Sequence, residues 1–190
     1  MFFIADSKGE ATMSNERLLP RIVAVWTVAA VVSGCVGPAP ARDAVGDFSI
    51  YLVKQGVSAQ RMTEMDLSQL ELEEVPILSI DDIVMYTWET HQIELTDPAR
   101  QRVARLKVPV QTGAPFVVCV GAERVYSGAF WTSFSSMSFH GIVIDTLLAR
   151  MDGQPVRIQL GYPSRSMLEG EDLRSDPRIL RSLRKAGKLK

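Results

Sequence analysis

The fold is set by residues 115–131, which read P-F-V-V-C-V-G-A-E-R-V-Y-S-G-A-F-W. Pro115–Val120 is a continuous apolar run, and such a run predicts a strand that is buried on both faces. Residues 121–123 predict a turn that leads into Arg124–Trp131 as the antiparallel partner strand. This stretch therefore predicts a β-hairpin in the core of the protein.

Strand and helix patterns continue on both sides of this hairpin. The Asp-Pro pairs at 97–98 and 176–177 predict helices that run to Leu106 and to Gly187, because Asp caps a helix and Pro suits its first turn. The pattern of Ser58–Glu74 favours neither a helix nor a strand. The alternation of polar and apolar residues and the β-branched composition predict further strands. Short capping or helical patterns predict two helical turns. The strands are expected at Phe48–Lys54, Trp88–Leu95, Phe139–Asp145 and Val156–Leu160, and the turns at Ile80–Tyr86 and Leu147–Arg150.

This order of elements indicates an α+β fold, with a mainly antiparallel mixed sheet and about two helices on one face. The chain has 190 residues, 46% of them hydrophobic and 23% charged, which suits one globular domain over residues 48–190. Its 21 basic and 22 acidic side chains give a net charge of -1. A nucleic-acid-binding protein normally carries a clustered basic excess, so no nucleic-acid partner is expected.

The amino-terminal region has the pattern of a secretory signal. Arg17 and Arg21 precede the uncharged run Ile22–Val32, which is shorter than the ~20 helical residues that cross a bilayer core. Val32, Ser33 and Gly34 then lead into Cys35. The alternative is an uncleaved anchor over residues 22–41, although residues 37–40, G-P-A-P, would break its helix.

The V-S-G-C string at residues 32–35 resembles the lipobox of bacterial lipoproteins. In that family the Cys thiol receives a diacylglyceryl group, and a peptidase then cuts before the Cys. The resemblance implies a signal peptide over residues 1–34, or from Met13 if that is the start, and a lipidated tether over residues 35–47. Acyl chains on Cys35 would hold the protein to a membrane of the cell envelope. In a two-membrane bacterium this implies the periplasmic side of the outer membrane, otherwise the outer face of the cell membrane.

Ile93–Asp145 resembles the periplasmic head region of the SecD protein-export subunits. Three pieces carry the likeness: I-E-L-T-D-P-A-R from residue 93, G-A-P-F-V-V-C-V from residue 113 and R-V-Y-S-G-A-F-W from residue 124. The resemblance implies a ferredoxin-like subdomain. It implies no proton-driven export, because the sequence lacks the family's transmembrane helices. Bacterial lipoproteins with similar P-F-V-V-C-V and G-A-F-W-T strings are a closer likeness, but they imply no activity.

Few residues have a pattern that carries chemistry. His91 and His140 are the only histidines, and without H-x-x-x-H or C-x-x-C spacing they predict no metal site. Cys119 lies in the apolar run and is expected to be a small buried side chain rather than a nucleophile. No cofactor is expected.

Two regions are candidate binding surfaces. Trp131, Phe134, Phe139 and His140 would form a patch for a peptide or sugar if the three rings are exposed together. The basic residues Arg178, Arg181, Arg184 and Lys185 of the last helix could meet anionic lipid or an acidic partner, or they could simply be its solvated face.

The sequence thus favours a lipid-anchored, non-catalytic binding or assembly module of the envelope, with an envelope protein or peptide as partner. One alternative is a hydrolase that uses Ser and His around residues 133–145, although no G-x-S-x-G motif is present. Another is a structural lipoprotein that self-associates.

Replacement of Cys35 by Ser removes the thiol that would be alkylated. We expect the Cys35→Ser protein to lose acyl label and membrane association, as measured by fractionation and mass spectrometry. Cys119→Ala is the matched control and should keep both. A wild-type protein that is unlipidated and fractionates as soluble would contradict the lipobox hypothesis.

Overall fold

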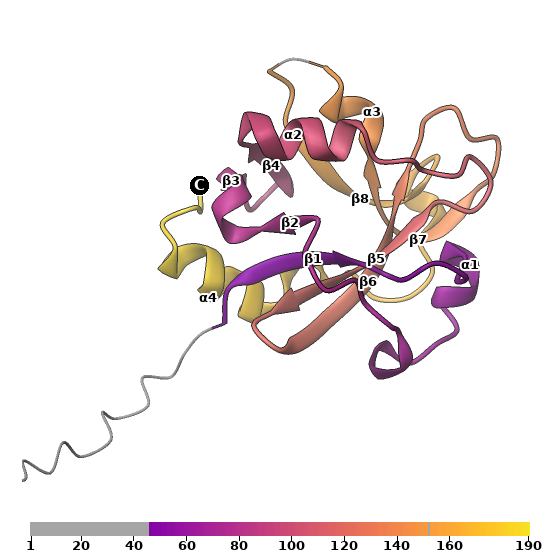
Figure 1. Cartoon of the computed structure of the whole chain (residues 1–190), viewed down its shortest axis with the longest axis horizontal. Helices are drawn as coiled ribbons and strands as arrows, with labels where there is room; N and C mark the ends of the chain where they lie inside the picture. The colour runs from indigo at the N-terminus through magenta and orange to yellow at the C-terminus, as the bar shows by residue number, and fades with distance from the viewer. Residues whose placement is uncertain (1–45, 152) are drawn as a thin grey trace, which may run out of the picture. The chain divides into compact units, whose positions relative to one another are not determined.

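The described strands form one eight-stranded mixed sheet in the order β2-β1-β5-β6-β7-β8-β4-β3. The computed structural model describes residues 46–151 and 153–190 (Figure 1). The signal, lipobox and tether residues up to position 45 lie outside this part of the chain. The strands are β1 Phe48–Leu52, β2 Leu78–Ser79, β3 Ile83–Thr87, β4 Gln92–Leu95, β5 Ala114–Val120, β6 Glu123–Trp131, β7 Phe139–Asp145 and β8 Val156–Tyr162.

Neighbouring strands are antiparallel except for β6 and β7. These two run parallel, with Gly128 opposite Ile142 and Trp131 opposite Asp145. The α+β class and the mainly antiparallel mixed sheet are therefore confirmed. A ferredoxin-like subdomain is not confirmed.

Helices pack on both faces of the sheet. They are α1 Ala59–Met62, α2 Asp97–Ala104, α3 Thr146–Ala149 and α4 Pro177–Lys185, with 3₁₀ turns η1 Leu67–Gln69, η2 Ile80–Asp82, η3 Arg165–Met167 and η4 Leu173–Ser175. Residues of α2, α3 and α4 pack into one hydrophobic cluster, whereas α1 packs into another. The two helices expected from the Asp-Pro pairs, α2 and α4, therefore lie on one face as predicted, and among the described helices only the short α1 packs on the other. Among the described helices, none is long and apolar enough to cross a bilayer.

The strand β5 explains why two clusters form. Its alternate residues Phe116, Val118 and Val120 face the first cluster, which also contains Phe48 and Phe130. Val117 and Cys119 face the second cluster together with Trp131 and Phe139. Because successive side chains of a strand point to opposite faces, a continuous apolar run fits only a strand covered on both sides. The buried hairpin predicted from residues 115–131 is confirmed.

The two outermost strands lie close together because the sheet curls. β2 and β3 are at opposite ends of the strand order, yet only η2 separates them along the chain. The ring of Phe48 in β1 contacts the ring of Tyr86 in β3 edge-on, with centroids 6.5 Å apart. The first cluster therefore fills the concave side of the sheet.

Two local predictions need correction. The helical turn expected over Ile80–Tyr86 ends at Asp82, and the remaining residues belong to β3. The Asp82 carboxylate accepts the backbone N–H of Ser79 at 2.8 Å and its hydroxyl at 2.9 Å, so the capping box is complete within one turn. In the strand expected over Trp88–Leu95, only Gln92–Leu95 pairs with β3, and the residues before it form the connecting turn.

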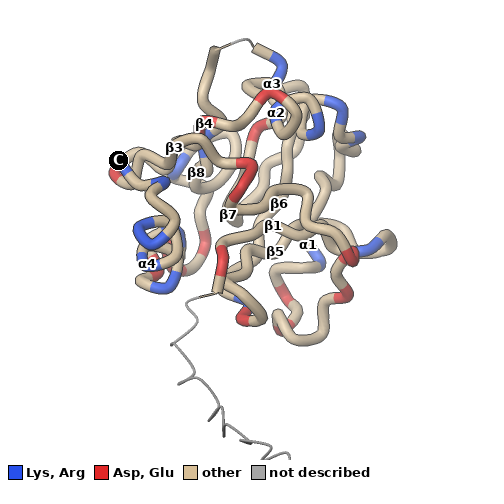
Figure 2. The backbone as a smooth tube through the Cα atoms, turned by 60° about the vertical axis from the view of Figure 1, so that its left-hand side comes forward, with Lys and Arg blue, Asp and Glu red and all other residues tan. Residues whose placement is uncertain are grey.

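The carboxyl-terminal helix forms as the Asp-Pro signal predicts. Asp176 accepts the backbone N–H of Arg178 at 2.8 Å, and Pro177 occupies the first turn of α4. Ile179 and Leu183 are buried, and the Lys and Arg residues of α4 are blue around the α4 label in Figure 2. Beyond α4, residues 188–190 bond to the edge of β3, where Tyr86 donates its N–H to the carbonyl of Lys188 at 2.7 Å.

One buried hydrogen bond joins α4 to the sheet. The backbone N–H of Phe48 donates to the hydroxyl oxygen of Ser182 at 2.8 Å, and both residues are about 1% exposed. In Ser182→Ala this N–H would lose its partner, so we expect a loss of about 1–3 kcal/mol in the free energy of unfolding. Denaturant unfolding measures the change. Ser166→Ala, at an exposed position, is the control and should change stability by less than about 0.5 kcal/mol; equal effects would contradict the assignment.

Candidate functional site

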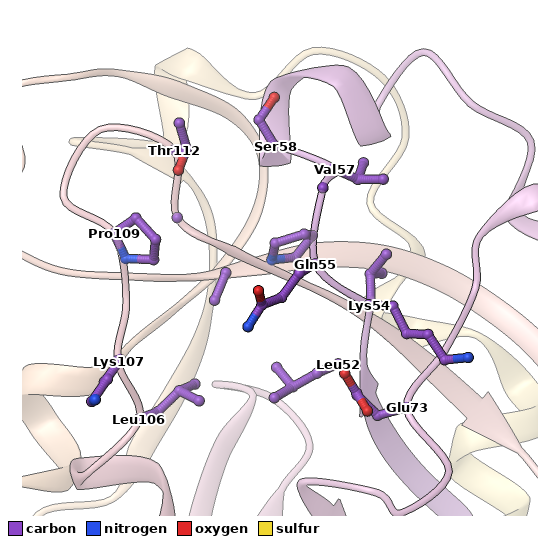
Figure 3. Close-up of a pocket in the computed structure, with 15 residues that line it drawn as sticks. Leu52, Lys54, Gln55, Val57, Ser58, Glu73, Leu106, Lys107, Pro109 and Thr112 are labelled. Carbon is purple, nitrogen blue, oxygen red and sulfur yellow. The ribbon is translucent and has the colours of Figure 1, made fainter.

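The main candidate site is a groove beside the end of β1. It has a volume of about 710 Å³ and lies between two segments far apart in the sequence, residues 52–58 and residues 106–115. The first continues β1 towards α1, and the second connects α2 to β5. Figure 3 shows Leu52 and Leu106 in the lower part of the groove and Gln55 at its centre.

Apolar side chains dominate the groove, and charged groups stand at its sides. Leu52, Val57 and Leu106 are half-buried and pack against the two clusters. Lys54 and Lys107 lie on opposite sides in Figure 3, with Glu73 next to Lys54. The groove can therefore take an apolar group and place an anionic group near a lysine at either side.

The floor of the groove rests on Trp131. Gly113 lines the groove in a left-handed conformation with φ +62°, and a Cβ at this position would lie 2.5 Å from the Trp131 ring. Only glycine permits this backbone conformation and this close approach together. The buried indole thus supports the groove from below.

A second depression continues from the first. It has a volume of about 470 Å³ and shares Leu52, Lys54 and Glu73 with the groove. Residues 74–77 and Arg102 form the rest of its wall. Arg102 is held by Asp82 at 2.7 Å and by the carbonyl of Ile77 at 2.9 Å, so this wall is fixed. Together the two depressions offer an elongated surface along the end of β1.

The aromatic patch expected at residues 131–140 does not form. Trp131 and Phe139 are each 1% exposed and stack on one another in the second cluster, with ring centroids 5.2 Å apart. Phe134 is 72% exposed, and His140 is also exposed. The prediction was wrong for Trp131 and Phe139. The neighbouring serines indicate an exposed segment, but both rings lie on the side of their strands that faces the second cluster.

The side chains of the alternative hydrolase form two separate pairs. The hydroxyl of Ser133 bonds to the carboxylate of Asp145. His140 Nδ1 lies 2.6 Å from a carboxylate oxygen of Glu169. Within the described chain no hydrogen bond joins His140 to a serine. A serine nucleophile needs a base within hydrogen-bond reach, so this arrangement provides no support for acyl transfer.

Within the described residues, neither Cys119 nor a cluster of acidic side chains supports a thiol nucleophile or a metal centre. Cys119 is 4% exposed, and burial raises the pKa of its thiol, which disfavours the nucleophilic thiolate. No group of three or more His, Cys, Asp or Glu residues in the described ranges could hold a metal ion.

The basic residues of α4 differ in their exposure. Arg178 bonds to Asp176 at 2.7 Å and to Glu123 at 3.3 Å, and these carboxylates raise the pKa of the guanidinium. Arg181, Arg184 and Lys185 are exposed. Three of the four residues of the predicted basic surface are therefore exposed.

His91 has a structural environment that its sequence does not indicate. It lies in the turn between β3 and β4 with φ +52° and is 6% exposed. Its Nδ1 lies 2.9 Å from the Tyr86 hydroxyl, and its ring contacts Trp88. Burial, with Arg174 as a second cause, lowers the pKa of His91 to about 4, so the ring is neutral at pH 7.

Comparisons with protein-family models, with curated proteins and with solved structures found no match.

The groove was not predicted from the sequence. Its walls come from connecting segments, and their only visible signals are the turn-forming residues Gly56, Pro109 and Gly113.

The low pKa of His91 makes stability depend on pH. The folded pKa of about 4 lies below the usual value of about 6.5, so the unfolded chain binds the proton more readily. The stabilisation that comes from the neutral His91 ring is complete above pH 6.5. As the pH falls towards 4, the free energy of unfolding decreases by about 2–3 kcal/mol. Urea unfolding across this range measures it.

His91→Asn tests the assignment, because Asn tolerates a positive φ and does not titrate. We expect a lower stability at pH 7 but a flatter dependence between pH 6.5 and 4. His140→Gln is the control and should keep the wild-type dependence, since the exposed His140 pair contributes little. An unchanged slope in His91→Asn would contradict the prediction.

Proposed function

We propose that this protein is a lipid-anchored, extracytoplasmic binding module that holds an extended segment of an envelope protein in the groove beside β1. The supporting observation is the groove itself, which has a volume of about 710 Å³, a mainly apolar lining and a lysine on each side. The segment would insert apolar side chains between Leu52, Val57 and Leu106. A carboxylate of the segment would lie near Lys54 or Lys107.

The elongated form of the surface favours a peptide over a compact ligand. The second depression extends the first past Leu52 and Glu73, so successive side chains of one extended chain can reach both. Extended segments combine main-chain hydrogen bonds with pockets for alternate side chains.

The charges at the groove favour an acidic segment. No described residue pairs with the side chain of Lys107, and Lys54 has only an exposed pair with Glu71 at 3.7 Å. Such exposed pairs contribute little, so both ammonium groups are free to meet a partner. Glu73 disfavours an acidic group at its own position, which gives the segment a preferred direction.

The groove supports binding rather than chemistry. Neither histidine lines it, nor does Cys119. The Ser58 hydroxyl accepts the backbone N–H of Arg61 at 3.2 Å and thereby caps α1. No histidine base therefore stands beside the Ser58 hydroxyl, as acyl transfer by a serine requires.

The anchor follows from the lipobox-like residues Val32–Cys35 rather than from the groove. Acyl chains on Cys35 would keep the domain at a membrane surface, where a second weak contact benefits from high effective concentration. Loss of the anchor and loss of groove binding are separate outcomes, since Cys35 and the groove can be altered independently.

A bulky side chain at Gln55 should block the groove, because this residue is exposed and occupies its centre. We expect Gln55→Trp to weaken binding at least about tenfold while leaving the stability unchanged. The measurement uses the full-length protein in nanodiscs and heptapeptides selected on it from a display library, with affinity read by fluorescence anisotropy.

Gln60→Trp is the matched control, since Gln60 is also an exposed glutamine but lies on α1 outside the groove. It should bind the selected peptides as the wild type does. Selected sequences should combine apolar and acidic residues. Equal affinity for Gln55→Trp and wild type, or selection of peptides without apolar residues, would overturn the proposal.

A further inference from the structure

A separate depression of about 370 Å³ lies beside β8, and arginines dominate it. Arg157 and Gln159 come from β8, Arg165 from η3, Arg174 from η4, and Glu89 and His91 from the turn between β3 and β4. Three arginines and one glutamate thus line the depression. None of these residues lines the groove beside β1.

Arg174 is held in place by its neighbours. Its Nε and Nη2 donate to the two carboxylate oxygens of Asp172 at 2.8 and 2.7 Å, and its Nη1 donates to the carbonyl of Ile158 at 2.8 Å. Its side chain is only 10% exposed. A guanidinium has five N–H donors, so this rigid group keeps donors beyond the three that these bonds use.

Arg157 and Arg165 have no such partners. Neither side chain forms an ion pair or hydrogen bond with any residue of 46–151 or 153–190. The two cations line one depression with Arg174, whose charge Asp172 already balances. An anion placed between them would offset their mutual repulsion and accept charge-assisted hydrogen bonds.

His91 forms part of the wall of the same depression. The hydroxyl of Tyr86 and His91 Nδ1 lie 2.9 Å apart, and this hydrogen bond fixes the orientation of the ring. The backbone of His91 has φ +52°, which is uncommon for a residue other than glycine. This conformation, fixed by the buried ring, holds the imidazole at the wall of the depression.

We propose that this depression binds a phosphate group, carried by a small soluble molecule or by a lipid headgroup. Arginines from a strand and two 3₁₀ helices line the depression, which suits a tetrahedral oxyanion with several acceptor oxygens better than a flat carboxylate. Arg157 and Arg165 supply the charge, whereas Arg174 supplies a fixed donor and the His91 ring forms part of the wall. This phosphate site is separate from the function proposed for the groove and does not depend on it.

Calorimetric titration of the full-length protein in nanodiscs of neutral lipid with inorganic phosphate, at constant ionic strength, tests the site. We expect Arg157→Gln and Arg165→Gln each to weaken binding at least about fivefold without a change in unfolding midpoint. Arg61→Gln, which removes an exposed arginine from α1, should bind as the wild type does. Unchanged affinity in both depression variants would overturn the proposal.

Two further titrations identify the source of the phosphate group. Glycerol 3-phosphate serves as a soluble phosphomonoester, and phosphatidylcholine vesicles with phosphatidic acid present the same group on a membrane. The vesicle titration uses full-length Cys35→Ser, so that an acyl anchor does not mask the contact. Binding of either probe that Arg165→Gln weakens supports the site and names its source; no binding of inorganic phosphate or of either probe overturns it.

Discussion

The short connection between the two outermost strands constrains the whole molecule. Only the three-residue turn η2 joins β2 to β3, so the sheet must curl until its two ends are neighbours. The aromatic contact between Phe48 and Tyr86 lies across this junction. The concave side can then enclose a single large cluster, and α2, α3 and α4 cover its openings. Residues 188–190 pair with the free edge of β3, which would otherwise expose unpaired backbone groups.

The curl also explains why polar side chains are buried at its margin. Tyr86 and His91 bond to each other within the core, and Arg174 reaches a strand carbonyl while Asp172 balances its charge. Hydrogen bonds from the side chain and the backbone N–H of Arg174 lower the pKa of Asp172, against the opposing effect of burial. Such groups are costly to bury without partners, so they fix the orientation of the turn and of η4. Because the turn and η4 are fixed in this way, the wall of the arginine-lined depression is rigid.

The groove has a different origin, because it forms where regular pairing stops. β1 ends at Leu52, and the chain then turns away towards α1 while the segment after α2 approaches from the other side. Half-buried apolar residues remain uncovered between them. The close packing of Gly113 over Trp131 keeps this gap from collapsing. Binding surfaces on connecting segments that a rigid sheet holds in place are a common arrangement.

The sequence alone determined the α+β class, the buried hairpin of residues 115–131 and the capped helix after Asp176, because periodicity and caps are local properties. It also carries the lipobox-like residues that end at Cys35, a signal read as sequence. Only the tertiary structure decided that Trp131 and Phe139 are buried, that Ile83–Thr87 is a strand and that three arginines from separate elements share one depression. Those outcomes depend on which distant segments meet as the sheet curls, and local patterns in one chain do not encode that.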